Sequence, residues 1–321
     1  MIEVAASSYD ASIALLCYNQ ENYITEALNA ILNQQGVNLE IIVSDDGSTD
    51  KTYEIVSSLV ANYKGQHHVR CIRHSKNLGF VKNFCETIKK CSSEYIIYAA
   101  GDDISNPDRA LKIVDAFKKS GALLVHSHAV CLNEKDEVID RNYPLKLTGD
   151  NPSLNTISVS SALYLGATGA YSRELFTKYG YFEDKNLIED LVLGFRAVLE
   201  NRINFVDKEL VRYRTTTGLT SKYNLSKSNY CEFRANYHKR MVSVFIQRLS
   251  DLKKSTHSKN QKLARVLKNA IFIEKIRMSL WKDNLSFVTG FRKFPSINYC
   301  IEFFKYNRDV KHIRSMSNCE Q

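Results

Sequence analysis

Residues 39–50 have the sequence LEIIVSDDGSTD, in which a short apolar run is followed at once by two acids, a glycine and hydroxyl side chains. An apolar run of this length, bounded by turn-forming residues, is typical of a strand buried on both faces. Asp50 then precedes a helical pattern of apolar residues over 53–60, so we expect Asp50 to cap the start of a helix. The stretch therefore predicts a buried strand, a polar turn and a helix, in that order.

The same unit of strand, turn and helix recurs on both sides of this stretch. Strands are predicted at residues 12–17, 39–43, 69–72, 95–99 and 122–125. Helices are predicted between them at residues 23–31, 53–60, 80–90 and 107–117. Pro107 suits the first turn of the last helix. Such regular alternation argues for an α/β fold, in which a Rossmann-like, mainly parallel sheet carries helices on both faces.

The rest of the chain divides into two parts. Up to residue 214 the pattern is less regular, with a strand or loop at 166–171, helices at 173–179 and 188–199, and strands at 203–206 and 211–214. After Gly218, apolar and basic residues recur at helical spacing, which predicts helices around 233–252, 258–281 and 297–309. We therefore expect a first domain over residues 1–221 and a helical C-terminal appendage over 222–321.

Composition excludes several classes of protein. Of the 321 residues, 44% are apolar and 25% charged, as in a folded globular protein rather than a disordered chain. No apolar run approaches the roughly 18 residues that span a bilayer, and the N-terminus lacks the pattern of a signal peptide. The eight cysteines include no C-x-x-C pair, so we expect free thiols and a cytoplasmic protein.

The charge is divided unevenly along the chain. Residues 1–221 carry 23 Lys and Arg against 28 Asp and Glu, a net charge of −5, whereas residues 222–321 carry 21 against 7, a net charge of +14. This asymmetry indicates a basic module for an anionic surface, either nucleic acid or membrane. The alternative is a basic helix face that meets only solvent.

Polar clusters follow three of the predicted strands, at the point where each strand ends. They are Tyr18-Asn19, Asp45-Asp46 and Asp102-Asp103. Ligands of open α/β sheets bind beyond the carboxyl ends of the strands, so the clusters mark a candidate ligand site. Each also has a structural interpretation, because Asp, Asn, Gly and Ser are common turn and cap residues.

Two pairs of carboxylates could carry chemistry. Asp102-Asp103 could hold a hard divalent ion that bridges to substrate phosphates. Glu189-Asp190 begins a predicted helix, where negative charge favours the helix dipole. Alternatively, one of these two carboxylates serves as a general base toward a hydroxyl.

In order and spacing, these motifs resemble the inverting family 2 glycosyltransferases of the GT-A fold, over residues 12–221. The resemblance rests on an ordered set of motifs: Tyr18-Asn19, residues 43–50, Asn77-Leu78-Gly79, Asp102-Asp103, Pro107, residues 169–176, Glu189-Asp190 and Tyr213-Arg214. It implies transfer of a sugar, with inversion, from a nucleotide-diphosphate donor, such as a UDP-sugar, to a saccharide hydroxyl. Within the family, it resembles bacterial enzymes of surface-polysaccharide (O-antigen or capsule) biosynthesis, whose acceptors are carried on polyprenyl diphosphate.

The resemblance also implies a site for the sugar nucleotide. Tyr18 would pack on the base, Asp46 would recognise the base, and Asp45 would lie toward the ribose. The implied nucleotide-binding set comprises Tyr18, Asp45, Asp46, Asn77, Gly79, Asp102 and Arg214.

Metal binding and catalysis are assigned on the same basis. Asp102 and Asp103 would hold Mn²⁺ or Mg²⁺, and Asp190 would deprotonate the acceptor hydroxyl. The chain departs from the family pattern in two places: Ala100 replaces the first acid of the Asp-x-Asp metal motif, and Thr216 stands where a histidine is frequent. Asp102 would then hold the ion mainly through donor phosphates and water, and Arg212 or Arg214 would contact the diphosphate.

The basic C-terminal region suits the surface of a membrane that carries a lipid-linked acceptor, which would make the protein peripheral on the cytoplasmic face. The candidate contacts are Trp281, Phe291, Phe294, Phe303 and Phe304, with Arg292, Lys293 and Lys305. The alternative is a helical cap that closes the core or forms a dimer.

Two other functions compete with sugar transfer. A nucleic-acid-binding protein would explain the charge of the C-terminal region, but the region lacks a zinc motif and an aromatic RNA-binding signature. Another nucleotide-dependent enzyme, such as a nucleotidyltransferase, typically has a glycine-rich, basic phosphate loop near its N-terminus. Residues 12–22 contain no Gly, Lys or Arg, which counts against that class.

Overall fold

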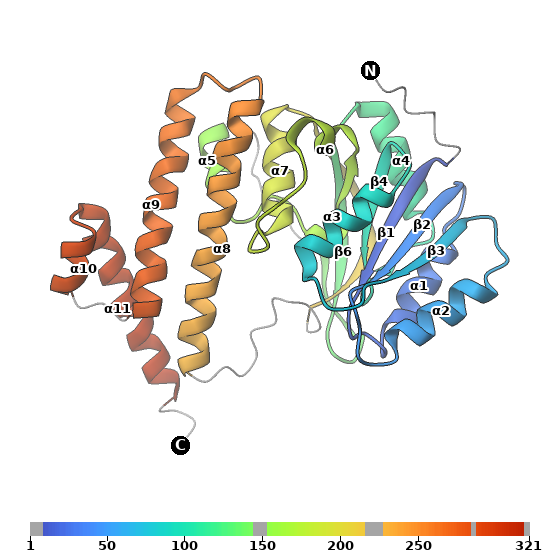
Figure 1. Ribbon diagram of the computed structural model, residues 1–321, viewed down its shortest axis with the longest axis horizontal. Helices are drawn as coiled ribbons and strands as arrows, with labels where there is room; N and C mark the ends of the chain where they lie inside the picture. The colour runs from blue at the N-terminus through green and yellow to red at the C-terminus, as the bar shows by residue number, and fades with distance from the viewer. Residues whose placement is uncertain (1–8, 144–152, 216–226, 284–286, 318–321) are drawn as a thin grey trace.

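A computed structural model describes residues 9–143, 153–215, 227–283 and 287–317 of the chain. Within these residues, one nine-stranded sheet has the order β3-β2-β1-β4-β8-β6-β9-β5, and β7 pairs with β6 at its side (Figure 1). The strands are β1 (Ala11–Cys17), β2 (Leu39–Asp45), β3 (His68–Arg73), β4 (Tyr95–Ala100), β5 (Ile104–Ser105), β6 (Leu124–Leu132), β7 (Val138–Tyr143), β8 (Ala170–Ser172) and β9 (Ile203–Arg214).

Helices cover both faces of this sheet. Those of the sheet region are α1 (Ile24–Leu32), α2 (Thr52–Asn62), α3 (Phe80–Lys90), α4 (Arg109–Ser120), α5 (Leu154–Ser158), the 3₁₀ turn η1 (Gly166–Thr168), α6 (Glu174–Tyr179) and α7 (Glu189–Leu199). Side chains of β1 alternate between two cores: Ile13 and Leu15 pack with α1, α2 and α4, while Ala14 and Leu16 pack with α3, α6 and α7. This alternation is the period of two expected of a strand buried on both faces.

The sheet is mainly parallel, as predicted. Strands β1 to β4 are parallel to one another, and so are β6 and β9, whereas β8 runs antiparallel to both β4 and β6. The predicted α/β architecture with helices on both faces is therefore confirmed. Strand β8 lies between the parallel block β1 to β4 and the parallel pair β6 and β9. Because it pairs with both β4 and β6, the sheet is continuous.

Several predicted boundaries are wrong for identifiable reasons. The strands predicted at 203–206 and 211–214 form a single strand, whose register against β6 shifts around His128. The exposed residues Asp207 and Lys208 lie at this irregularity and interrupt the apolar pattern. Strand β7 was not predicted because it is exposed along its whole length and has no apolar alternation.

Two predicted helix starts are also displaced. The N-cap residue of α2 is Lys51, although the Asp50 carboxylate does accept the Thr52 amide at 2.9 Å. Helix α4 begins at Arg109, so Pro107 lies just before the helix and not in its first turn. Both sequence signals indicate the turn correctly but misplace the first helical residue.

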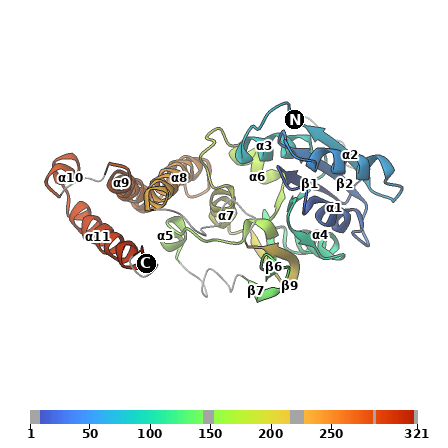
Figure 2. The ribbon, with the colours of Figure 1, turned by 90° about the horizontal axis from the view of Figure 1, so that it is seen from below.

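The C-terminal region consists of α8 (Lys227–Lys254), α9 (Gln261–Asp283), α10 (Phe287–Lys293) and α11 (Ile297–Ser317). Helices α8 and α9 form a long hairpin beside α7; α10 lies beyond α9, and α11 runs alongside the hairpin and packs on both of its helices (Figures 1 and 2). Met241, Val244 and Phe245 of α8 belong to the same core as α3 and α7. The inner half of the predicted appendage is thus part of the main core. The predicted division at 221/222 lies outside the described residues.

The outer half has a small core of its own. Trp281 is buried with Ala235, Ile276, Leu280, Tyr299 and Tyr306, and Phe294 and Phe303 pack against this cluster. The prediction that Trp281, Phe294 and Phe303 are surface contacts is therefore wrong. Phe291 and Phe304, from the same predicted set, are exposed.

Two further sequence-based expectations concern cysteines and membrane-spanning helices. The seven cysteines within the described residues are all free, as predicted. No helix in the described part of the chain is long and apolar enough to cross a bilayer.

A buried ion pair joins α7 to α8. The Arg196 guanidinium donates to both carboxylate oxygens of Asp251, at 2.8 and 3.3 Å, and also to the Gly180 carbonyl at 2.8 Å. Both charged side chains are fully buried. Removal of either partner would leave the other charge buried and uncompensated.

We therefore expect Asp251→Ala to lower the free energy of unfolding by about 3–5 kcal/mol in a chemical denaturation experiment. The matched control is Glu174→Ala, which removes the partner of Arg202 in a half-exposed ion pair and should cost about 1 kcal/mol or less. Equal losses in the two variants would contradict a structural role for the buried pair.

Candidate donor and catalytic site

Parallel pairing brings the three predicted polar clusters to one edge of the sheet. Cys17, the last residue of β1, is in register with Asp45 of β2, and Leu16 is in register with Ala100 of β4. The Asp46 amide donates to the Cys17 carbonyl and the Gly101 amide to the Leu16 carbonyl, each at 2.9 Å. Tyr18, Asp46 and Asp102 therefore begin their turns from neighbouring, aligned strand ends.

The first turn is tied to the second by Asn19. Asn19 has a positive φ of 51°, its amide donates to the Ser48 hydroxyl at 3.0 Å, and its side-chain oxygen accepts the Thr49 amide at 2.9 Å. Tyr18, the neighbour of Asn19, is 42% exposed. Its ring is thus available to a ligand while the backbone beside it is held in place.

Asp46 holds the segment Asn77-Leu78-Gly79 against the turn after β2. Its two carboxylate oxygens accept the amides of Leu78 and Gly79, at 2.8 and 3.0 Å. Gly47 is required here, because φ is +72° and a Cβ atom would lie 2.7 Å from the Lys76 carbonyl carbon. Burial raises the pKa of Asp46, although these two amides oppose the shift. Asn77 and Gly79 therefore lie beside Asp46, as a shared site requires.

Asp45 lies deeper and is fully buried. One of its oxygens accepts the Ser48 amide at 3.0 Å, and the same oxygen is 3.8 Å from Nε of Arg73. The other oxygen is buried without a hydrogen-bond partner. A carboxylate in this position makes the turn electronegative, and Arg73 offsets part of that charge.

A hollow of about 460 Å³ lies between this turn and the end of β3, and its lining includes Arg73 and His74. The guanidinium of Arg73 also lies 4.3 Å from the centre of the Tyr53 ring, and its side chain is 43% exposed. Sequence analysis missed both residues because it ended the third strand at Ile72. Extension of that strand by one residue would have placed Arg73 at the same edge as Asp45.

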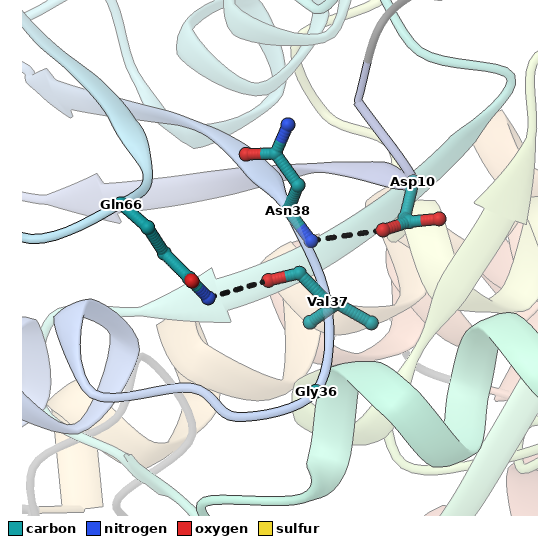
Figure 3. A pocket seen from close by; sticks show the side chains of 5 residues that line it. All are labelled: Asp10, Gly36, Val37, Asn38 and Gln66. Carbon is teal, nitrogen blue, oxygen red and sulfur yellow. Dashed lines mark hydrogen bonds between the residues drawn. The ribbon is translucent and has the colours of Figure 1, made fainter.

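A second hollow, of about 520 Å³, lies at the opposite edge of the sheet, where β1 and β2 begin (Figure 3). Its polar groups bond mainly to one another: the Asn38 amide donates to Asp10 at 2.8 Å, and the Gln66 side chain donates to the Val37 carbonyl at 3.0 Å. Ligands of such sheets bind at the carboxyl ends of the strands. We therefore place the candidate site at the hollow beside Arg73.

The turn after β4 is fastened by Arg214. The Arg214 amide donates to Asp103 at 3.0 Å, and its guanidinium donates to the Asp102 carbonyl at 2.7 Å. The same guanidinium donates to Glu26 and Asp136, each at 2.6 Å. Arg214 is buried and fully engaged by these acids, which favours a positioning role over direct contact with a diphosphate. Arg212, two residues earlier, is exposed.

Asp102 and Asp103 offer part of a metal site. Within the described ranges, no group of three or more His, Cys, Asp or Glu side chains is arranged to hold an ion. Two adjacent carboxylates nevertheless suit Mg²⁺ or Mn²⁺, which prefer oxygen ligands. Burial, and then the charge of Asp102, raises the pKa of Asp103 well above its usual value, which a cation would reverse. The two acids fit as part of a coordination sphere that phosphate and water complete. Thr216 lies outside the described residues.

Glu189 and Asp190 begin α7 and face η1. A Cβ atom on Gly166 would lie 3.4 Å from a carboxylate oxygen of each acid, which is an ordinary contact distance, so this turn lies directly against the pair. Burial raises the pKa of both, and the charge of Asp190 raises that of Glu189 further. Arg248 and Arg240 hold the pKa of Asp190 down. Because each negative charge opposes ionisation of the other, the pair holds its second proton to a higher pH than an isolated carboxyl would.

The two carboxylate pairs lie near one another. The buried Tyr98 hydroxyl lies within the field of Glu189, Asp102 and Asp103, whose charges add to burial in raising its pKa. Arg109 joins the two regions, because its guanidinium donates to the Tyr98 carbonyl at 2.8 Å and to the Ala167 carbonyl of η1 at 3.0 Å. The turn after β4 and the start of α7 thus form one site.

Arg248 of α8 supports the start of α7 from behind. It donates to the Leu191 carbonyl at 2.7 and 3.1 Å, and to the carbonyls of Ser158 and Ser160 at 2.8 and 2.9 Å. Burial lowers the pKa of Arg248 to about 9, and the charge of Asp190 opposes that shift. Sequence analysis missed this residue, because nothing in a basic helix distinguishes a buried arginine from an exposed one.

Comparison with known proteins bears directly on this site. Residues 12–192, more than half of the chain, match the family model described as glycosyl transferase family 2. An uncharacterised glycosyltransferase of Haemophilus influenzae is 26% identical over 94% of this chain and 95% of its own length.

Two solved structures share the fold. The first is residues 1–349 of TarS from S. aureus in complex with UDP-GlcNAc, with a TM-score of 0.61 and 18% identity over 92% of this chain and 80% of that one. The second is the mannosyltransferase PcManGT from Pyrobaculum calidifontis in complex with GDP-Man and Mn²⁺, with a TM-score of 0.54 and 14% identity over 95% and 87% of the two chains. Together with the family match, they confirm the predicted GT-A fold. The chain is a glycosyltransferase and belongs to glycosyl transferase family 2.

Proposed function

We propose that this protein transfers a sugar from a UDP-sugar to a hydroxyl of a saccharide acceptor on polyprenyl diphosphate, with inversion, during synthesis of a bacterial surface polysaccharide such as O-antigen. The convergence of two carboxylate pairs, Asp102-Asp103 and Glu189-Asp190, around Tyr98 and η1 supports the proposal. One pair suits the diphosphate end of a sugar donor, and the other suits proton transfer. The protein would act peripherally on the cytoplasmic face of the membrane that carries the acceptor.

The donor's nucleotide would occupy the edge formed by the turns after β1, β2 and β3. Tyr18 would stack on the base, while Asp45 and Asp46 would accept hydrogen bonds from base and ribose. Asn77 and Gly79 would line the same turn. Arg73 adds a half-exposed cation that could approach the phosphates.

The reaction would be a single displacement. Asp190 would take the proton of the acceptor hydroxyl, whose oxygen attacks the anomeric carbon while the bond to the nucleoside diphosphate breaks. Burial brings the pKa of Asp190 closer to neutral pH, which suits a general base. A divalent ion at Asp102 and Asp103, when bound, would offset the negative charge that grows on the leaving diphosphate.

The nucleotide is tested by calorimetric titration with UDP, GDP and dTDP, each with and without Mn²⁺. We expect UDP to bind, and to bind more tightly with Mn²⁺. Asp102→Asn should remove the increment due to Mn²⁺ and leave metal-free binding, whereas Asp46→Ala should weaken both, because it releases the Asn77-Leu78-Gly79 turn. Tight binding of GDP in place of UDP would contradict the donor assignment, and an unchanged increment in Asp102→Asn would contradict the metal assignment.

The general base is tested by a pair of isosteric variants. Asp190→Asn should lower turnover at least about 100-fold, the usual contribution of a general base, with nucleotide affinity unchanged. Glu189→Gln is the matched control and should be nearly silent, because an amide mimics the protonated acid. If Glu189→Gln abolishes turnover and Asp190→Asn does not, the two roles are reversed.

Arg248 is expected to act as a positioning residue. Arg248→Gln should lower kcat by about tenfold to a hundredfold, since small displacements of a reacting group are costly. It should also move the acidic limb of the pH–rate profile to higher pH, because loss of this cation raises the pKa of Asp190. Arg240, Glu189 and the buried hydroxyls of Tyr164 and Tyr171 also interact with the charge of Asp190, and all four are unchanged in this variant.

The pH–rate profile distinguishes a positioning role of Arg248 from a general loss of protein stability. Arg265→Gln, which removes an exposed cation from α9, should change neither kcat nor the profile. A lower kcat in Arg248→Gln with an unmoved acidic limb would mean that Arg248 is structural only.

A further inference from the structure

Exposed large apolar side chains gather on the outermost helices. Five of the eleven such side chains among the described residues lie between positions 288 and 304, although this segment is short. They are Val288, Phe291, Ile297, Ile301 and Phe304, and we call them the outer face. Scattered exposed apolar residues are ordinary, but a cluster indicates a contact surface.

The outer face follows helical geometry. Ile297, Ile301 and Phe304 are spaced four and three residues apart, so they lie on one side of α11. Ile297 is 77% exposed and Phe304 is 67% exposed. The other side of α11 carries Tyr299 and Tyr306, which are buried against Trp281. Helix α11 therefore presents a second apolar side whose residues Ile297, Ile301 and Phe304 are largely exposed.

The charges beside this face are mainly positive. Arg292, Lys293, Lys305 and Arg308 are exposed. The neighbouring acid Glu302 is buried and accepts hydrogen bonds from Arg277 at 2.7 and 3.2 Å and from Lys305 at 3.0 Å. Lys305 and Arg277 thus offset the charge of Glu302, while Lys293 pairs with Asp283 at 3.1 Å and Arg308 lies 4.0 Å from Asp309. The five cations named here outnumber these three acids, so the surface keeps a net positive charge.

We propose that the outer face is the surface by which this protein docks on an anionic lipid bilayer. Exposed apolar side chains flanked by lysine and arginine match the boundary between acyl chains and anionic headgroups. A second copy of the chain fits less well, because a symmetric contact would bring the same cations together. This inference rests on the proposed function in one respect: docking would bring the candidate site to a lipid-linked acceptor.

The position of the outer face agrees with this role. Helix α10 lies beyond α9 and α11 runs alongside the α8–α9 hairpin, so both lie apart from the strands β1, β2 and β4 whose ends form the ligand edge (Figures 1 and 2). Contact with a bilayer would therefore leave the candidate donor site uncovered. The α8–α9 hairpin, which shares the core of α7, connects the outer face to the candidate site.

The test is co-sedimentation of the full-length protein with vesicles of phosphatidylcholine alone and of phosphatidylcholine with phosphatidylglycerol. We expect binding to the anionic vesicles, weakened by salt, and little binding to the neutral ones. Ile297→Ser and Phe304→Ser should each weaken partitioning by about tenfold or more, as expected when one large apolar side chain is no longer buried. Arg292→Gln with Arg308→Gln should weaken it selectively on anionic vesicles.

Ile246→Ser is the matched control, because Ile246 is an exposed isoleucine on α8. It should bind vesicles as the unaltered protein does. Equal binding by Ile297→Ser, Phe304→Ser and the unaltered protein would overturn the proposal. Self-association that Ile297→Ser abolishes, without vesicle binding, would instead identify the face as a dimer contact. Nucleotide affinity should be the same in all these variants, so loss of the membrane proposal leaves the transferase proposal standing.

Discussion

The parallel register of β2, β1 and β4 is the constraint on which the rest of the site depends. Two backbone hydrogen bonds, from Asp46 to Cys17 and from Gly101 to Leu16, continue the sheet just past the strand ends. They oblige three polar turns to start from the same edge. A shift of one residue would reverse the side chains of a whole strand between the two cores and displace its turn. Burial of β1 and β2 along their whole length makes such a shift costly.

Buried arginines perform the second task, which is to connect distant segments. Arg109, Arg196 and Arg248 are the largest fully buried side chains of the described chain. Arg109 links the end of β4 to η1, Arg196 links α7 to α8, and Arg248 links α8 to the start of α7. The planar guanidinium suits this task, because it can donate to several carbonyl or carboxylate oxygens in fixed directions. Each would be costly to bury without those partners.

Much of this arrangement could be predicted from the sequence. The predictions that failed did so for physical reasons. Buried strands such as 39–43 are predicted by their apolar runs, and acids that directly follow a strand indicate the ligand edge. Strand β7 carries no such signal, since it is exposed throughout. Arg73 was missed because the predicted third strand ended one residue too early. Arg248 was missed because a charged side chain gives no sign, in a single sequence, of whether it is buried. The prediction that Trp281 is a surface contact was wrong for a similar reason, since an aromatic residue in a basic helix suits a core as well as a surface.

The helical region illustrates how a compositional signal divides once packing is known. A net charge of +14 over residues 222–321 suggests one basic surface, yet the cations separate into two groups. Arg248 and Arg277 are engaged by carbonyls and acids within the protein, whereas Arg292, Lys305 and Arg308 remain at the surface. The first group fastens the helices to one another and to α7. Exposed cations such as Lys253, Lys259 and Arg265 also lie on the α8–α9 hairpin. Those of the second group lie on the outer helices, together with the exposed apolar side chains of α11. The charge of the region therefore supports both internal connection and external contact, and the outer helices differ from the hairpin in combining exposed cations with a cluster of exposed apolar side chains.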